Sequence, residues 1–324
     1  MTTIALSIGD PNGIGPEIAV KSALALDGSV RVVLIGDAHV VAHYAGDHPV
    51  RRIDGAAVQE SVAGTIDVMS VDGIAGAAFS PGHCNAASGR ATVAYLEGAL
   101  SLVRDGGAAA IVACPHNETA VNAAGIPFTG YPRLLAQLSG VPERAVFLML
   151  VGGGLRMVHA TLHERLADAL ARLDPALIAD AARAAHVALR ALGIETPRIG
   201  ICGINPHAGE AGLFGDDDDR ITVPAADTLR AEGIDAVGPA GADLLFAERG
   251  CDAYVAMYHD QGHIPVKLLA GRDSSALSIG TGLVFASVGH GSAPDIAGQD
   301  RADPSALLRT LRLIGEISTR ENVV

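Results

Sequence analysis

The sequence predicts an α/β protein built from two domains. Hydrophobic residues make up 49% of its 324 residues and charged residues 18%, with 39 glycines and no tryptophan. Such small apolar side chains suit helices packed closely on parallel strands. Short apolar runs alternate with amphipathic stretches along much of the chain, as strands and helices do in this fold class. A single core stops growing near roughly 250–300 residues, so the length favours two cores.

Charge and cysteine usage narrow the class of function. The formal net charge is -13, and Lys and Arg are scattered singly, so nucleic acid and anionic membranes are disfavoured as partners. No stretch reaches the roughly 20 apolar residues of a membrane span, and no secretory signal is recognised at the start. The cysteines are far apart and include no C-x-x-C, which favours buried thiols in a reducing cytoplasm. They are Cys84, Cys114, Cys202 and Cys251.

The first elements are a strand, a glycine-rich loop and a helix. Residues 3–8 form the strand, GDPNGIGPE follows, and the helical periodicity runs to Leu26. Pro16 fits the first helical turn, and Glu17 favours the positive end of the helix. The loop has the spacing of neither G-x-G-x-x-G nor a P-loop. It is therefore equally compatible with an anion or substrate loop and with a plain strand-to-helix turn.

Further elements follow from apolar runs and helical periodicity. Residues 123–135, with closely spaced helix-breaking residues, are expected to form a loop, and the aspartates at 216–219 a solvated loop. His39, His43 and His48 fall in a polar, loop-like region and are interpreted as surface histidines. Strands are expected at 30–35, 108–113, 145–151, 155–162, 198–202, 253–258 and 283–288, and helices at 90–103, 173–192, 222–231 and 304–317.

The stretch DAYVAMYHDQGH, residues 252–263, carries the strongest functional signal. A buried strand ends there in His259, Asp260, Gln261 and His263, with Gly262 expected to allow a tight turn. Open α/β sheets bind their ligands where strands end. An imidazole followed directly by a carboxylate and an amide therefore indicates part of a functional site.

Two more histidines occupy the same kind of position. His163 and His207, like His259, come just after a predicted strand in one half of the chain. Three neutral imidazoles with open coordination positions can hold zinc, cobalt, nickel or manganese as a Lewis acid. The alternative is three unrelated histidines that cap strands. His159 is expected within a strand and is interpreted as structural.

The chain resembles the 4-hydroxythreonine-4-phosphate dehydrogenase family over nearly its full length. The motifs are GDPNGIGPEI, GIPFTG, INPHAGE, MYHDQGHIPVK and VGHGSAPDIAG, in this order. The resemblance implies two α/β/α domains like those of isocitrate and isopropylmalate dehydrogenases, and a homodimer with its active site in an interdomain cleft at the dimer interface. It places a cofactor-side domain at 1–125 plus 285–324, and a metal, substrate and dimerisation domain at 126–284.

The resemblance also implies roles for individual residues. His163, His207 and His259 would hold a divalent metal, which is zinc, cobalt, nickel, manganese or magnesium. From the chemistry of the expected reaction, we hypothesise that Lys267 binds a substrate carboxylate or relays a proton, and that Asp260 holds His259 or a metal-bound water. The expected cofactor-binding residues are Asp10, Asn12, His290, Gly291, Ser292, Ala293 and Asp295.

The cofactor expected from the resemblance is NAD. Asp295 lies in HGSAPDIAG, which resembles the adenine-side loop of the isopropylmalate enzymes. A carboxylate there can accept hydrogen bonds from both ribose hydroxyls and repels a 2′-phosphate. The alternative is that Asp295 only caps a turn before the final helix.

Departures from the phosphate-binding members indicate a different substrate. Tyr131 and Pro132 replace a His-Thr pair, Ser278 replaces an asparagine and Phe285 replaces an arginine. A phosphate dianion would lose a strong contact with that arginine. These departures, with CPHNETA, GYPRLLA and HIPVKLLA, resemble the subgroup that oxidises terephthalate cis-dihydrodiol to protocatechuate, carbon dioxide and NADH.

The sequence thus predicts a metal-dependent, NAD-linked, decarboxylating dehydrogenase of small molecules. The expected substrate-binding residues are Tyr131, Lys267, Ser278 and Phe285. The alternatives are 4-hydroxythreonine-4-phosphate dehydrogenase of pyridoxal phosphate synthesis, a phosphothreonate dehydrogenase, and a catalytically silent metal-binding relative.

Overall fold

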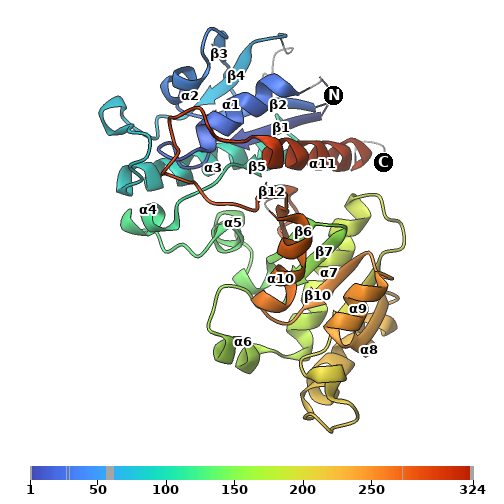
Figure 1. Ribbon diagram of the computed structural model, residues 1–324. Helices are drawn as coiled ribbons and strands as arrows, with labels where there is room; N and C mark the ends of the chain where they lie inside the picture. Colours follow the sequence, from blue (N-terminus) through green and yellow to red (C-terminus); the bar gives the residue numbers. More distant parts are fainter. Residues whose placement is uncertain (1, 27, 29, 56–61, 272, 322–324) are drawn as a thin grey trace. The chain divides into compact units, whose positions relative to one another are not determined.

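The computed structural model describes residues 2–26, 28, 30–55, 62–271 and 273–321, with side chains up to residue 316. The chain divides into two compact units (Figure 1). The first unit comprises Met1–Gly130 and Leu283–Val324, and the second comprises Tyr131–Gly282. The chain therefore leaves the first unit once and returns to it near its end.

The first unit is built on parallel strands in the order β3-β4-β2-β1-β5-β12. The last strand, β12, is contributed by the returning segment and places Phe285 opposite Ile111 of β5. The bounds are β1 Thr2–Ser7, β2 Val30–Gly36, β3 Val50–Arg52, β4 Ile66–Ser70, β5 Ala110–Ala113 and β12 Phe285–Val288. Strands from the N-terminal part of the sequence and from the returning C-terminal segment thus belong to one sheet.

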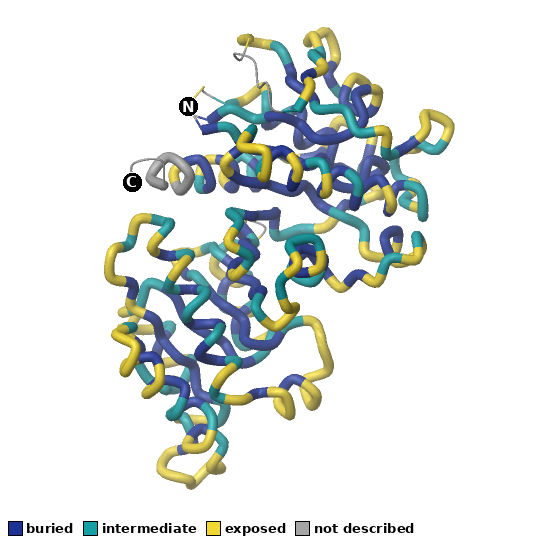
Figure 2. The backbone as a smooth tube through the Cα atoms, turned by 180° about the vertical axis from the view of Figure 1, so that it is seen from behind, coloured by how far each residue is buried: buried dark blue, intermediate teal, exposed yellow. Residues whose placement is uncertain are grey.

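Helices cover both faces of this sheet. Ile35 and Val30 of β2 are five residues apart, so their side chains point to opposite faces. A Cβ on Gly98 of α3 would contact Ile35, whereas one on Gly315 of α11 would contact Val30. The unit therefore has three layers, and Figure 2 shows its strands mostly buried. The helices are α1 Gly15–Ala25, α2 Ala38–Tyr44, α3 Ala86–Arg104, α4 Glu118–Ala123, α11 Ser305–Glu321 and the 3-10 turn η1 Gly76–Ala78.

The second unit has a mixed sheet in the order β11-β6-β7-β10-β8-β9. Strands β11, β6 and β7 pair in antiparallel fashion, whereas β7, β10, β8 and β9 are parallel neighbours. The carboxyl ends of β7, β10 and β8 therefore meet at one edge. The bounds are β6 Phe147–Gly152, β7 Leu155–His159, β8 Arg198–Cys202, β9 Asp235–Ala240, β10 Ala253–Ala256 and β11 Ser275–Ile279.

Helices α7 and α10 provide most of the helical packing against this second sheet. Asp174 caps α7, accepting a hydrogen bond from the backbone N–H of Leu177 at 2.8 Å. The helical segments are α5 Tyr131–Ser139, η2 Glu143–Ala145, α6 Leu166–Arg172, α7 Pro175–Ala191, η3 Pro206–Gly209, η4 Asp218–Thr222, α8 Val223–Ala231, α9 Ala242–Glu248 and α10 His259–Ala270.

Four local predictions are wrong. Asp218 and Asp219 lie in the helical turn η4 rather than in a solvated loop, and Asp218 is buried. Residues 131–135 are helical, because α5 begins at Tyr131 and Pro132 occupies the first turn, where no backbone N–H is needed. His39 and His43 lie on helix α2 rather than in a loop. Gly262 lies inside helix α10 and makes no tight turn. In each case a helix begins where the sequence has polar or helix-breaking residues.

The four cysteines are thiols that form no disulfide bond with one another, and Cys114 and Cys202 are buried. Burial raises the pKa of both thiols, which makes them unreactive. Within the described ranges, none of the helices combines the length and the hydropathy that a membrane span requires.

Close packing of α3 on α4 gives a test of the first unit. A Cβ on Gly89 would lie 2.1 Å from the backbone oxygen of Ala120, which cannot move cheaply. We expect Gly89→Ala to lower the free energy of unfolding by about 1–3 kcal/mol, although alanine is normally favoured in helices. The control is Gly76→Ala, where no atom lies within 4 Å. Urea unfolding checks this, and a Gly89→Ala protein at least as stable as the control would contradict the packing described.

Candidate functional site

The three predicted metal-binding histidines follow the three adjacent parallel strands of the second unit. His163 comes after β7, His207 lies in the turn η3 after β8, and His259 is the first residue of α10 after β10. This is the sheet edge at which open α/β folds bind ligands. His207 has the left-handed backbone conformation, φ 55°, as do Ala208 and Glu210. Strained backbone of this kind is characteristic of functional sites.

Two of these histidines are paired with carboxylates. The His259 Nδ1 atom lies 2.7 Å from Asp260 Oδ1, and the His207 Nδ1 atom lies 2.7 Å from Glu210 Oε2. The carboxylate of Glu210 raises the pKa of His207. When Nδ1–H donates to a carboxylate, Nε2 keeps its lone pair, which is the usual arrangement of metal-binding histidines. The donor chemistry of both residues therefore fits a divalent metal.

The single chain brings together two members of the trio. The ring centroids of His163 and His259 are 5.5 Å apart. The described residues contain no group of three or more His, Cys, Asp or Glu side chains placed to hold a metal ion. The convergence of all three histidines on one ion therefore remains a prediction.

A chain of histidines that the sequence interpretation missed lies beneath His259. The ring of His263 stacks on that of His259, with centroids 3.8 Å apart and planes 12° from parallel. His263 Nδ1 lies 2.9 Å from His159 Nε2, and His159 Nδ1 lies 3.2 Å from the carbonyl oxygen of Leu148. A carbonyl only accepts, so His159 Nδ1 carries a proton and Nε2 accepts from His263. This leaves His263 Nε2 with a lone pair.

The burial of this pair keeps both rings neutral. Desolvation lowers the pKa of His159 to about 3 and that of His263 to about 4, and neighbouring histidines reinforce both shifts. Gly262 makes the pair possible, because a Cβ there would lie 2.5 Å from His159 Nε2. His159 is therefore structural, as predicted, and it supports the site directly. Residues four apart share one face of a helix, so the spacing of His259 and His263 indicates the stack once a helix is assigned here. The sequence interpretation assigned no helix to these residues.

Lys267 extends the site two turns along α10. Its Nζ donates a hydrogen bond to Ser274 Oγ at 2.9 Å, and partial burial lowers the pKa of Lys267. The other predicted substrate residues are buried: Tyr131 is 4% exposed, Ser278 is 3% exposed and Phe285 is 2% exposed. Lys267 thus adds a half-buried cation to the helix that carries His259.

In the first unit, Asp10 and Asn12 are completely buried. Asn12 Oδ1 accepts from the backbone N–H of Ser80 at 2.8 Å, and Asp10 Oδ2 accepts from Ser88 Oγ at 3.1 Å. Burial raises the pKa of Asp10. These contacts fix the shape of the glycine-rich loop, and a role of Asp10 and Asn12 in binding the cofactor remains a prediction.

The predicted cofactor loop lies against this glycine-rich loop. The backbone carbonyl oxygen of Ser292 accepts a hydrogen bond from the backbone N–H of Ile14 at 2.9 Å, and Ser292 is itself buried. Ala293 has a positive φ of 39°. Asp295 is exposed, and the His290 Nδ1 atom lies 3.2 Å from the carbonyl oxygen of the exposed Gly291. The loop therefore presents the Asp295 carboxylate at the surface of the unit.

The two units define an α/β protein that carries histidines at one strand edge of its second sheet. The chain belongs to the PdxA family, because the family model described as pyridoxal phosphate biosynthetic protein PdxA matches residues 29–314. This confirms the resemblance predicted from the motifs.

Three relatives refine the comparison. The chain is 46% identical to 1,2-dihydroxy-3,5-cyclohexadiene-1,4-dicarboxylate dehydrogenase of Comamonas sp. over 96% of both chains. It is 41% identical to D-threonate 4-phosphate dehydrogenase of Cupriavidus necator over 99% of this chain and 98% of that one. A solved terephthalate 1,2-cis-dihydrodiol dehydrogenase from Burkholderia xenovorans LB400 is 52% identical, covers 97% of this chain and 98% of its own, and has a TM-score of 0.74. These relatives support a dehydrogenase of the PdxA family.

The neutral histidine pair predicts how stability depends on pH. In the unfolded chain a histidine has a pKa near 6.5, whereas the folded values are about 3 for His159 and about 4 for His263. As pH falls below 6.5, the unfolded state gains protons that the folded state does not, so stability falls. His159→Gln, which can still donate and accept, should show a shallower loss between pH 6.5 and 4.5. Urea unfolding of metal-free protein measures both slopes, and equal slopes would contradict the assignment.

Proposed function

We propose that this protein is a divalent-metal-dependent, NAD-linked dehydrogenase that oxidises and decarboxylates an aromatic-acid cis-dihydrodiol. The expected reaction converts terephthalate dihydrodiol to protocatechuate, carbon dioxide and NADH. The observation that carries the proposal is Phe285, an apolar side chain buried in β12 where phosphate-binding members have an arginine. The two dihydrodiol dehydrogenases among the relatives support the same substrate class.

The metal would be held by His163, His207 and His259. Asp260 and Glu210 would orient two of these rings through their Nδ1 atoms. Two subunits of a homodimer would complete the ligand set. A bound divalent ion supplies Lewis acidity, which lowers the pKa of a coordinated hydroxyl. The neutral His263–His159 pair beneath His259 would hold that ring in place.

The reaction is an oxidation followed by loss of carbon dioxide. Bound NAD would supply the hydride acceptor for the carbinol carbon, whose hydroxyl would lose its proton. The resulting ketone lies β to a carboxylate, so the C–C bond electrons move toward the ketone as carbon dioxide leaves. One proton then returns to the enolate oxygen, and the product is an aromatic catechol.

Lys267 would act on the substrate in this sequence. Its ammonium group can bind a substrate carboxylate as an ion pair. Burial lowers its pKa, which brings the group closer to the range in which it can exchange a proton. Alternatively, its neutral amine form would accept the hydroxyl proton, and the ammonium group so formed would return one on decarboxylation. The proton lost and the proton gained balance, so NADH and carbon dioxide are the net co-products.

A phosphorylated hydroxy acid is the second candidate substrate. The 41% identity to a D-threonate 4-phosphate dehydrogenase favours it, and 4-hydroxythreonine 4-phosphate belongs to the same class. Tyr131 and Phe285 argue against both, because neither side chain neutralises a phosphate. A catalytically silent relative would bind neither metal nor NAD, so metal content and NAD binding of the purified protein distinguish it.

A substrate panel tests the proposal. The ratio kcat/KM should be at least about a hundredfold higher for terephthalate cis-dihydrodiol than for D-threonate 4-phosphate or 4-phosphohydroxythreonine. A missing charge-assisted contact to phosphate costs about 3 kcal/mol, which corresponds to that ratio. NADH formation and carbon dioxide release are measured together, with chelator-treated protein as the control. Higher efficiency on either phosphorylated compound would contradict the proposal.

A further inference from the structure

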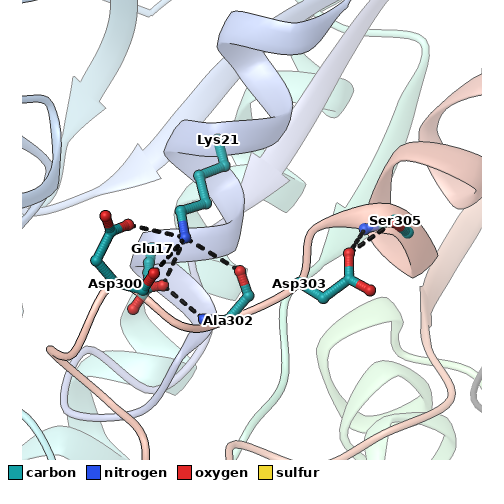
Figure 3. Close-up of polar contacts among 6 residues, drawn as sticks. All are labelled: Glu17, Lys21, Asp300, Ala302, Asp303 and Ser305. Atoms are coloured by element: carbon teal, nitrogen blue, oxygen red, sulfur yellow. Dashed lines mark hydrogen bonds and ion pairs between the residues drawn. The ribbon is translucent and has the colours of Figure 1, made fainter.

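The segment between β12 and α11, residues 289–304, contains neither helix nor strand, yet it is fastened to the region of α1 at two points. At its start, the Ile14 N–H donates to the Ser292 oxygen at 2.9 Å. Near its end, the Ala302 N–H donates to Glu17 Oε1 at 2.7 Å (Figure 3). Asp295 lies between the two points.

Glu17 is an unusual residue to find at the second point. It is only 2% exposed, and its Oε1 atom accepts from both Ala302 N and Lys21 Nζ, the latter at 2.8 Å. Its Oε2 atom is buried without a hydrogen-bond partner in the described part of the chain. Burying a carboxylate is costly, and apolar side chains of similar size would stabilise a fold as well. The carboxylate therefore specifies the position of the segment rather than adding stability.

Lys21, one helical turn after Glu17 in α1, contacts the same part of the segment. Its Nζ atom donates to the backbone oxygens of Asp300 at 3.3 Å and Ala302 at 3.1 Å, and pairs with Asp300 Oδ1 at 2.8 Å (Figure 3). Asp300 has a left-handed φ of 55°, a strained conformation that needs such support. Asp303 then accepts from the Ser305 N–H at 2.9 Å, at the start of α11. We call Glu17, Lys21, Asp300 and Ala302 the latch.

We propose that Glu17 and Lys21 are positioning residues for the nicotinamide nucleotide. This inference rests on the proposed function and on the expectation that the exposed Asp295 carboxylate meets the adenosine ribose. The latch and the Ser292 contact fix the segment on both sides of Asp295 before the nucleotide arrives. A loop held in its binding conformation does not lose conformational entropy on binding, so the latch increases affinity for the nucleotide.

The test compares Lys21→Met with a matched control, Arg51→Met. Lys21 is 31% exposed and paired with buried Glu17, and Arg51 is 25% exposed and paired with buried Asp67. Arg51 lies on β3 and pairs with Asp67 of β4, which is not part of the latch. Lys21→Met should raise the Kd and KM for NAD about tenfold with kcat within about twofold. Amide hydrogen exchange should accelerate at residues 292–302 in this variant alone.

Three further variants distinguish loss of the latch from a general loss of stability. Lys21→Arg keeps a cation at this point and should restore most of the NAD affinity. Asp295→Ala should raise the KM for NAD by itself. In the Asp295→Ala protein, Lys21→Met should raise the KM for NAD by a smaller factor than it does in the natural protein, because the latch acts through Asp295.

The outcomes are distinguishable. If Asp295→Ala weakens NAD binding but Lys21→Met does not, the latch is overturned and the proposed function stands. If Lys21→Met and Arg51→Met weaken NAD binding equally, the effect is general destabilisation and the latch is overturned. If the natural protein binds no NAD, the proposed function itself fails.

Discussion

The contact on which the candidate site depends is the close approach of α10 to β7 at Gly262. A Cβ at this position would lie 2.5 Å from His159 Nε2 and 2.6 Å from Met157 Cγ, so only glycine allows this separation. The approach lets His263 reach His159, and His263 in turn stacks on His259. The position of His259 at the sheet edge thus depends on backbone packing at Gly262, about one helical turn further along α10.

In both units, buried polar residues fix the local geometry, and more accessible polar residues are available for chemistry. Asp10 and Asn12 in the first unit, and His159 in the second, are buried and have their hydrogen bonds satisfied inside the protein. They fix the shapes of loops and rings. Asp295 and His259 are more accessible and are held by these buried neighbours or by backbone contacts. Chemistry at such sites requires groups that are both reachable and held in one geometry, which the buried polar residues provide.

The sequence predicted much of the fold because most strands are short apolar runs ended by polar residues. Strand β8 occupies the predicted residues 198–202, and α7 begins after Asp174 as its capping pattern indicates. The helices α5 and α10 were missed because their first turns contain Pro132 and the polar run from His259, which local patterns assign to loops. Tertiary packing overrides those local preferences.

The sequence predicted site residues only where a side chain suited to metal binding also comes directly after a predicted strand. The position of His163, His207 and His259 after strands follows from the sequence, and adjacency of the strands follows from the sheet. The pairing of His263 with His159 joins residues 104 positions apart, so no local pattern contains it. Glu17 was interpreted as favouring the positive end of its helix, whereas its buried oxygen holds Ala302 at the other end of the chain.

The central claim is that the packing of α10 on β7 holds His259 in a metal-binding position. The most direct test is calorimetric titration of metal-free protein with zinc, comparing Gly262→Ala with Gly250→Ala. No atom lies within 4 Å of a Cβ added at Gly250, and alanine is otherwise favourable inside a helix such as α10. We predict that Gly262→Ala binds zinc at least about tenfold more weakly than the natural protein, and that Gly250→Ala binds it equally well. Equal zinc affinity in the two variants would contradict the account.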